Sequence, residues 1–339
     1  MPNCGTQCYL CDLPIRFDTY KGCSHGCKYC FTQKKIDIST VETGEGPQAL
    51  INFISGQRAA DTNWADWDIP LHWGGMSDPF QPIEKVARNS YECLKILRDT
   101  QYPFVVSTKG ALVADEEYLE LIAECNCVVQ ISAVCDSYNE MEAGCPSYDE
   151  RLKMARKVAD TGKRVIIRVQ PLMHEVALEV RDCLPRVAES GAHGIIIEGM
   201  KHSKSAPGLV RIAGDYAIDY ETIRSDFLML REKGHELGLK VYAGENRIRE
   251  LGDDLTCCGI DGLDGFRANT FNINHFIHGD FTQPTEGQKR AGTADCFGSL
   301  NQTTAYHYML KKNSFASMMA KFAKEKKALC RDVFGLSKK

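Results

Sequence analysis

Three cysteines in the spacing C-x3-C-x2-C, Cys23, Cys27 and Cys30, are the residues of this chain best suited to chemistry. Glycine and small polar residues separate them, so the loop can turn around a compact inorganic group. Three thiolates on a four-iron cluster leave one iron without a protein ligand. The alternative is a structural zinc knuckle, which needs a fourth Cys or His at short spacing, and His25 lies inside the loop. The loop therefore indicates bound metal, with iron–sulfur and zinc as the two options.

A second triplet, Cys4, Cys8 and Cys11, repeats the same spacing near the N-terminus. The chain has 16 cysteines in 339 residues, and clustered cysteines in a reducing compartment indicate metal or iron–sulfur ligation more often than disulfides. The triplet is a candidate auxiliary metal or cluster site, and the alternative is three free thiols on a terminal segment. The distant residues that could supply its fourth ligand are Cys257, Cys258 and Cys296. The isolated cysteines are predicted to be small buried hydrophobes: Cys93, Cys125, Cys127, Cys135, Cys145 and Cys183.

The overall composition is that of an ordinary globular protein. Hydrophobic residues make up 43% of the chain, charged residues 25%, and the net charge is −4. This balance carries no electrostatic footprint for tight nucleic-acid binding, so a small-molecule substrate is expected and nucleic acid is not. No apolar stretch approaches the length of a membrane span, and the first residues do not resemble a secretory signal. We therefore expect a cytoplasmic protein without a membrane partner.

Short apolar runs alternate with longer amphipathic segments along most of the chain. The predicted strands are 15–20, 69–73, 104–107, 128–133, 164–169, 194–198 and 240–243, and the predicted helices are 47–55, 83–97, 115–124, 148–161, 175–189 and 220–236. Such alternation calls for a parallel sheet with right-handed crossovers. The fold class is α/β, as a partial (β/α)6 TIM-like barrel with a C-terminal extension.

Three regions follow from this pattern. They are an N-terminal cysteine-containing segment at 1–14, the partial barrel at 15–245, and a C-terminal loop and helical extension at 246–339 that is predicted to cover the active-site rim. Residues 259–298 have the composition of a covering loop, although surface loops without function share it. A final helix is predicted at 314–329, with an apolar stripe for core packing.

Polar residues recur where the predicted strands end. The cysteine loop follows the first strand, Gly74, Gly75, Ser77 and Asp78 follow the second, Lys109 follows the third, and Ser132, Arg168 and Glu198 end the fourth, fifth and sixth. In a parallel barrel these ends meet at one rim, which carries the chemistry. Alternatives stay open: Lys109 could be a solvated loop lysine, and Arg168 or Glu198 could belong to a structural ion pair at the rim. A zinc knuckle would not explain the gathered rim residues.

At this point the chain resembles a known family. The C-x3-C-x2-C loop after the first strand, with Tyr29 before the third cysteine and a glycine pair after the second strand, is similar to the radical S-adenosylmethionine (SAM) superfamily. Three longer strings resemble its spore photoproduct lyase-like branch: Gly-Cys-Ser-His-Gly-Cys-Lys-Tyr-Cys-Phe, Gly-Gly-Met-Ser-Asp-Pro-Phe-Gln-Pro-Ile-Glu and Ser-Thr-Lys-Gly. The resemblance covers roughly residues 12–245.

The resemblance implies a set of cofactors and their residues. A [4Fe–4S] cluster would sit on Cys23, Cys27 and Cys30, its open iron would bind SAM, and a one-electron reductant such as flavodoxin or ferredoxin would reduce it under anaerobic conditions. SAM cleavage would then give a 5′-deoxyadenosyl radical that abstracts hydrogen from the substrate. The residues implied for SAM binding are Tyr29, Gly74, Gly75, Ser77, Lys109, Ser132 and Arg168.

The substrate is the part that the resemblance leaves open. DNA-repairing members of the branch carry a hydrogen-donating cysteine after the second strand, and Gly75 occupies the corresponding place here. A small heterocycle is therefore expected, bound by Asp78, Gln81, Glu198, His202, Tyr242, Glu245 and Arg247. Similar proteins include lyases that cut the modified base queuine to its 7-deazaguanine precursor, which makes queuine lyase the specific hypothesis. The alternatives are a nucleic-acid repair or modification enzyme and a non-catalytic electron-transfer protein.

Overall fold

The computed structural model describes residues 3–4, 11–34, 37–55, 69–212, 215–268 and 275. The sequence-based expectations for Cys8, for Cys296, for the later part of the covering loop and for the helix at 314–329 lie outside these residues.

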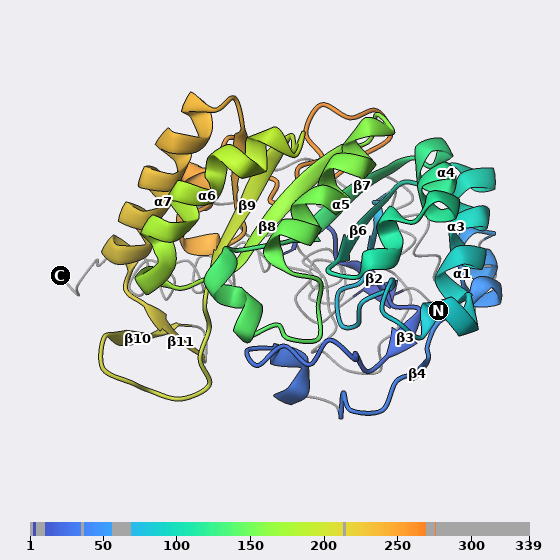
Figure 1. Ribbon diagram of the computed structural model, residues 1–339, viewed down its shortest axis with the longest axis horizontal. Coiled ribbons are helices and arrows are strands. Elements are labelled where there is room, and N and C mark those ends of the chain that lie inside the picture. Colours follow the sequence, from blue (N-terminus) through green and yellow to red (C-terminus); the bar gives the residue numbers. More distant parts are fainter. Residues whose placement is uncertain are drawn as a thin grey trace, which may run out of the picture.

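An eight-stranded sheet forms the centre of the protein (Figure 1). Its spatial order is β1 (Asn3–Cys4), β2 (Ile15–Phe17), β5 (Leu71–Trp73), β6 (Phe104–Thr108), β7 (Cys127–Ser132), β8 (Arg164–Leu172), β9 (Gly194–Gly199) and β12 (Lys240–Ala243). Only β1 is antiparallel to its neighbour, and the seven other strands are mutually parallel. In the described residues β2 and β12 are not paired, so the barrel is open between them. The predicted α/β partial barrel is confirmed, as six strand–helix units and a seventh parallel strand.

Helices cover the outer face of the sheet (Figure 1). They are α1 (Pro47–Ile54), α2 (Glu84–Ala87), α3 (Asn89–Thr100), α4 (Glu116–Glu124), α5 (Tyr148–Asp160), α6 (Ala177–Glu189) and α7 (Tyr220–Glu236). The single helix predicted over 83–97 is interrupted, because Arg88 takes a left-handed φ of 55° between α2 and α3. Capping explains two helix starts: the Ser147 and Glu150 side chains form a capping box on α5, and Asp219 caps α7.

The first predicted strand is divided in the structure. β2 ends at Phe17, and Tyr20–Lys21 forms β3, which pairs with β4 (Glu42–Thr43) in a separate two-stranded sheet. A second small sheet, β10 (Leu209–Ile212) with β11 (Asp215–Ile218), follows β9 and was not predicted. The shorter 3-10 helices are η1 (Phe31–Lys34), η3 (Ala111–Ala114), η4 (Asp136–Glu140), η5 (His174–Val176) and η6 (Asn246–Leu251).

The sheet is apolar toward the helices and partly polar toward the inside of the barrel. Every residue of β6 and β7 is buried, as expected for parallel strands covered on both faces. Strand pairing places Ser107 beside Gln130 and Ser132 beside Arg168, so these polar side chains share the inner face. Polar groups inside a barrel need partners or a ligand, which makes this face relevant to function.

The segment after β12 returns to the amino-terminal end of the strands. Arg164, the first residue of β8, donates hydrogen bonds to the carbonyl oxygens of Gly259 and Asp261 at 3.0 and 2.7 Å. This segment is orange in Figure 1 and lies at the other end of the sheet from the cysteine loop, which is blue. Coverage of the active-site rim by the C-terminal extension stays a prediction for the residues beyond 268.

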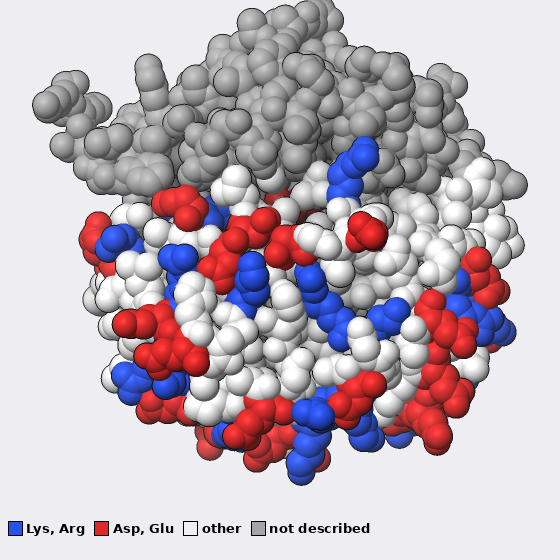
Figure 2. Space-filling model, turned by 90° about the horizontal axis from the view of Figure 1, so that it is seen from above, with Lys and Arg blue, Asp and Glu red and all other residues white. Residues whose placement is uncertain are grey.

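The distribution of charge and the character of the helices complete the description of the fold. Lys and Arg side chains alternate with Asp and Glu over the described part of the face seen in Figure 2. In the described part of the chain, no helix has both the length and the apolar character that a membrane span requires.

Candidate active site

The cysteine loop lies against the residues that follow β5. The Ser77 hydroxyl donates to the Gly22 carbonyl at 2.5 Å, and the Gln81 amide donates to the same oxygen at 3.2 Å. The Gln81 oxygen accepts from the Ser24 backbone N–H at 2.9 Å. Gln81 is fully buried. Ser77 and Gln81, expected at the SAM and substrate sites, therefore hold the cysteine loop in place in this structure.

His25 ties the loop to two other segments. Its Nδ1 lies 3.0 Å from the Gly144 carbonyl oxygen and its Nε2 lies 3.2 Å from Asp78 Oδ2. Burial alone would lower the pKa of His25, but the Asp78 carboxylate and the Gly144 carbonyl raise it. With both ring nitrogens used in this way, His25 is a poor fourth ligand for zinc.

Asp78 is a buried carboxylate with several donors around it. It accepts from the Thr108 hydroxyl at 2.7 Å, from the Lys109 N–H at 2.6 Å and from the Phe80 N–H at 2.9 Å. Burial would raise the pKa of Asp78, but His25 and these hydrogen bonds outweigh it and lower the pKa to about 2. The carboxylate therefore links the loops after β5 and β6 to the cysteine loop.

The thiols of the loop differ in their electrostatics. Cys27 Sγ lies 3.8 Å from Cys145 Sγ. The hydrogen bond from Cys145 lowers the pKa of Cys27 to about 7; burial opposes this shift and the Lys109 cation assists it. Burial and the nearby Asp78 carboxylate raise the pKa of Cys23 to about 12.

Cys145 corrects a sequence-based expectation. It was predicted to be a buried hydrophobe, but it is partly exposed beside Cys27 because the turn after η4 approaches the cysteine loop. The other isolated cysteines are buried as predicted: Cys93, Cys125, Cys127, Cys135 and Cys183.

Lys109 belongs to an ion network around a buried carboxylate. Its Nζ lies 3.7 Å from Glu142 Oε1, and its side chain is only 16% exposed, so it is not a solvated loop lysine. Glu142 also pairs with the buried Arg151 at 2.5 Å and accepts from the Tyr29 hydroxyl. The Lys109 ammonium lies 5.7 Å from the centre of the Tyr29 ring. A cation, a phenol and the Cys27 thiol thus meet at one side of the loop.

The glycine pair after β5 allows a close backbone approach. Gly74 has a φ of +84°, and a Cβ there would lie 2.3 Å from the Ser107 carbonyl oxygen. A Cβ at Gly75 would meet the Arg16 guanidinium at 2.4 Å. Next along the loop, the backbone N–H groups of Met76 and Ser77 donate to Asp18. Burial raises the pKa of Asp18 to about 7.

A hydrogen-bonded network crosses the inner face of the sheet. Arg168 donates to the Ser107 hydroxyl at 2.9 Å and to the Gln130 side-chain oxygen at 2.7 Å. It also donates to Gln170, which in turn donates to Glu198. Arg168, Gln170 and Glu198 are partly exposed, so the end of this network nearest the rim is open to a ligand. Ser132 ends β7 at the same rim, and its carbonyl oxygen accepts from Arg151 at 2.6 Å.

The remaining predicted substrate residues are not all close to this rim. Glu245 and Arg247 form a buried ion pair with each other, and Arg247 also donates to the Ile218 carbonyl. The backbone of His202 pairs with that of Tyr216. The Tyr242 hydroxyl donates to Asp261 at 2.7 Å and so reaches toward the amino-terminal end of the strands.

An open hollow borders the cysteine loop. Its volume is about 530 Å³, which is in the range of small-molecule sites. The residues that line it are Cys23, Ser24, Gly26, Gln33, Asp37, Ile38 and Ser39.

Sequence reasoning missed several residues that hold this site. Asp18, Glu142 and Arg151 lie outside every recognised motif, and Arg16 lies within the predicted strand at 15–20. One signal was available: Arg16 alternates with the buried Ile15 and Phe17, so it faces the same side as the inner polar residues. Glu142 and Arg151 gave no local signal, because their pairing depends on how α5 packs.

The predicted auxiliary triplet is only partly described. Cys11 interacts electrostatically with Cys257 and Cys258 but is not in the group whose ligand atoms lie within 4.8 Å of one another, so its part in an auxiliary site stays a prediction. Cys8 lies outside the described residues, and so does the side chain of Cys4.

Comparison with curated proteins gives distant relatives. An uncharacterized protein of Mycobacterium tuberculosis (strain ATCC 25618 / H37Rv) is 25% identical over 214 residues, which are 58% of this chain and 62% of the relative. An uncharacterized protein of Mycobacterium bovis matches to the same extent. This chain thus spans about three fifths of the length of the curated relatives it matches. No family model matches.

Among solved structures, spore photoproduct lyase has the same fold as this chain. The complex of that enzyme with dinucleoside spore photoproduct has a TM-score of 0.55 and 16% identity, covering 68% of this chain and 77% of that chain. A mutant of the enzyme with bound AdoMet and dinucleoside spore photoproduct has a TM-score of 0.53 and 16% identity, covering 68% and 76%. At this level of identity the likeness establishes the fold.

Proposed function

We propose that this chain is a radical SAM enzyme that acts on a small heterocyclic substrate, a modified nucleobase or nucleoside. The observation that carries the proposal is the position of the cysteine loop. Cys23, Cys27 and Cys30 lie on one loop that the residues after β5 and β6 fasten to the rim of the parallel sheet. The shared fold with spore photoproduct lyase, which has been seen with bound AdoMet, supports the same conclusion.

The donor set fits an iron–sulfur cluster. The three thiols are not in disulfides, and the hydrogen bond from Cys145 and the Lys109 cation favour the thiolate form of Cys27. When bound, the cluster and SAM would supply a 5′-deoxyadenosyl radical that abstracts hydrogen from the substrate.

The chain's own residues would hold SAM and exclude water. Lys109 is nearly buried next to the loop and could bind a carboxylate through its ammonium group. The backbone carbonyl groups of Gly74 and Gly75 could accept hydrogen bonds from the amine of SAM. Ser132, the last residue of β7, and Arg168, its partner within β8, would provide further polar contacts.

The inner polar network is the proposed substrate site. Arg168 offers hydrogen-bond donors, Glu198 offers acceptors, and Gln170 offers a donor and an acceptor. All three side chains belong to the network near the rim of the barrel. Such a set can bond the ring NH, carbonyl and amine groups of a purine or deazapurine. We propose queuine lyase activity, which would release a 7-deazaguanine precursor, as the specific reaction.

One observation favours a second candidate. Spore photoproduct lyase has been seen with dinucleoside spore photoproduct, so lesion repair on a nucleic acid is the competing function. The net charge of −4 and the mixed charges on the face in Figure 2 argue against a polyanionic substrate.

Anaerobic SAM cleavage with a reductant such as flavodoxin or ferredoxin tests these options. A small-base lyase should form 5′-deoxyadenosine in response to queuine or another free deazapurine, whereas a repair enzyme should respond only to an oligonucleotide. A protein that reduces its cluster but never cleaves SAM would be an electron carrier.

Two cysteine variants provide the control. Cys23→Ala should lose both iron and SAM cleavage, and Cys183→Ala, at a buried cysteine of α6, should keep both. If Cys23→Ala retained cluster and cleavage, the proposal would fail.

A further inference from the structure

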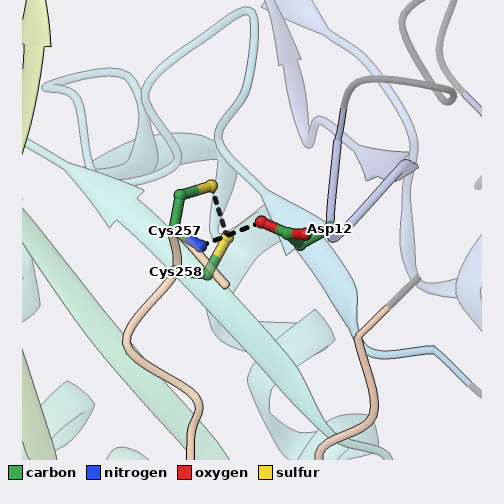
Figure 3. Close-up of side chains that lie close together, drawn as sticks. All are labelled: Asp12, Cys257 and Cys258. Carbon is green, nitrogen blue, oxygen red and sulfur yellow. Dashed lines mark hydrogen bonds between the residues drawn. The ribbon is translucent and has the colours of Figure 1, made fainter. Parts of the chain in front are cut away.

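A second group of thiols lies at the amino-terminal end of the barrel, next to the segment that precedes β2. Figure 3 shows its side chains close together. Asp12 precedes β2, and Cys257 and Cys258 follow η6. The carboxylate oxygen of Asp12 and the two sulfur atoms all lie within 4.8 Å of one another. Cys11, next to Asp12 in the chain, is not part of this group.

The spacing of these atoms matches a tetrahedral metal site. Cys257 Sγ and Cys258 Sγ are 3.6 Å apart, which is too long for a disulfide. Two thiolates that each lie about 2.3 Å from a tetrahedral zinc ion are about 3.8 Å apart. The observed separation is therefore near the value that one shared ion requires, and a sulfur-rich set with one carboxylate suits zinc.

We propose that Asp12, Cys257 and Cys258 bind one zinc ion. The protein ligands would be two thiolates and one carboxylate, and binding would release the thiol protons. This site does not depend on the proposed radical chemistry, because none of its residues belongs to the cysteine loop at 23–30 or to its supports.

The surroundings of Asp12 are those of a metal-bound carboxylate. Its Oδ2 accepts from Arg249 Nη1 at 2.7 Å and from the Cys257 N–H at 2.8 Å, and its Oδ1 lies 3.4 Å from His275 Nε2. A carboxylate can keep such partners and still offer a lone pair to an ion. Two thiolates and a carboxylate around Zn²⁺ carry net negative charge, which the fully buried Arg249 would offset.

The position of the site gives it a structural role. Asp12 and Cys257 are 245 residues apart in the chain, and they join the segment before β2 to the segment after β12. These are the two parallel strands between which the barrel is open. A metal ion here would tie the two edges together, and because it binds only the folded chain it would stabilise the fold. Its place at the amino-terminal end separates it from the catalytic rim.

Metal analysis tests the proposal without any activity assay. A Cys23→Ala/Cys27→Ala/Cys30→Ala variant of the full chain removes the iron site, so its remaining metal reports on the second site. We expect one zinc per chain in that variant, measured by inductively coupled plasma mass spectrometry after anaerobic purification. Adding Cys257→Ser and Cys258→Ser should abolish the zinc, whereas adding Cys183→Ser should not. Absence of zinc, its retention in the Cys257/Cys258 variant, or iron in its place would overturn the proposal.

A second measurement covers the case in which the serine variants do not fold. The chain with unaltered Cys257 and Cys258 is treated with a mercurial reagent, and released zinc is followed with a chromogenic chelator. Zinc should be released in proportion to the thiols that react. Substitution with Co²⁺ should give the strong visible absorption of tetrahedral thiolate coordination. If the chain held no metal and the number of reactive thiols were two fewer than its 16 cysteines, Cys257 and Cys258 would form a disulfide, and the zinc site would be refuted.

Discussion

Gly74→Ala tests how a backbone contact supports the cysteine loop. Gly74 has a φ of +84°, and a methyl group there would lie 2.3 Å from the Ser107 carbonyl oxygen and 3.0 Å from Pro79 Cδ. Gly162, after α5, is a matched control: its φ is +82°, and nothing lies within 4 Å of its added Cβ. The two substitutions share the cost of a left-handed alanine, and only Gly74→Ala adds a backbone clash.

The expected magnitudes follow from these contacts. A left-handed alanine costs roughly 1–2 kcal/mol, which is the whole effect expected for Gly162→Ala. Overpacking against a fixed backbone adds about 1–3 kcal/mol, so Gly74→Ala should lower the free energy of unfolding by roughly 2–5 kcal/mol. The strain would also move Ser77 and Asp78, whose side chains bond Gly22 and His25. We therefore expect Gly74→Ala, and not Gly162→Ala, to lose iron and SAM cleavage.

Urea unfolding of both cluster-free variants measures the stability difference. Iron content and 5′-deoxyadenosine formation, measured anaerobically after cluster reconstitution, give the functional readout. If the two variants lost equal stability, the clash with Ser107 would not matter. If Gly74→Ala kept its iron and its SAM cleavage, the loop after β5 would not position the cysteine loop.

Three further outcomes follow from the site. Lys109→Gln should weaken SAM binding by about 10- to 100-fold, which is the value of a charge-assisted hydrogen bond, while the iron content stays the same. Unaltered affinity for SAM in equilibrium dialysis would exclude Lys109 as the group that binds its carboxylate. Asp78→Asn breaks the buried pair with His25 and should cost roughly 3–5 kcal/mol in urea unfolding, an expectation that a loss below 1 kcal/mol would contradict. Burial raises the pKa of Asp18 from 3.8 to about 7, so the folded chain holds this proton more tightly than the unfolded chain. Its contribution to stability should fall by up to roughly 4 kcal/mol as the pH rises from about 4 to about 7, and Asp18→Asn should remove that slope; an identical slope in both proteins would refute the assignment.

The sequence by itself determined the features that depend on neighbouring residues. The apolar runs at 104–107 and 128–133 became β6 and β7 with shifts of one residue at their ends, because burial on both faces requires continuous apolar strands. The C-x3-C-x2-C spacing placed three thiols on one loop, because the three cysteines lie within eight residues of one another in the chain. Alternation of strands and helices then fixed the parallel sheet, since parallel strands need crossover connections.

Tertiary structure decided which distant residues meet. Cys145 lies beside Cys27, and Arg151 pairs with Glu142, because α5 and the turn before it pack against the cysteine loop. The sequence marked Asp78 as a rim residue but could not show that it pairs with His25. Most clearly, Asp12 and Cys257 come together over 245 residues. No periodicity in the sequence encodes such a contact, because it forms only when the sheet curves and brings the segments next to β2 and β12 together.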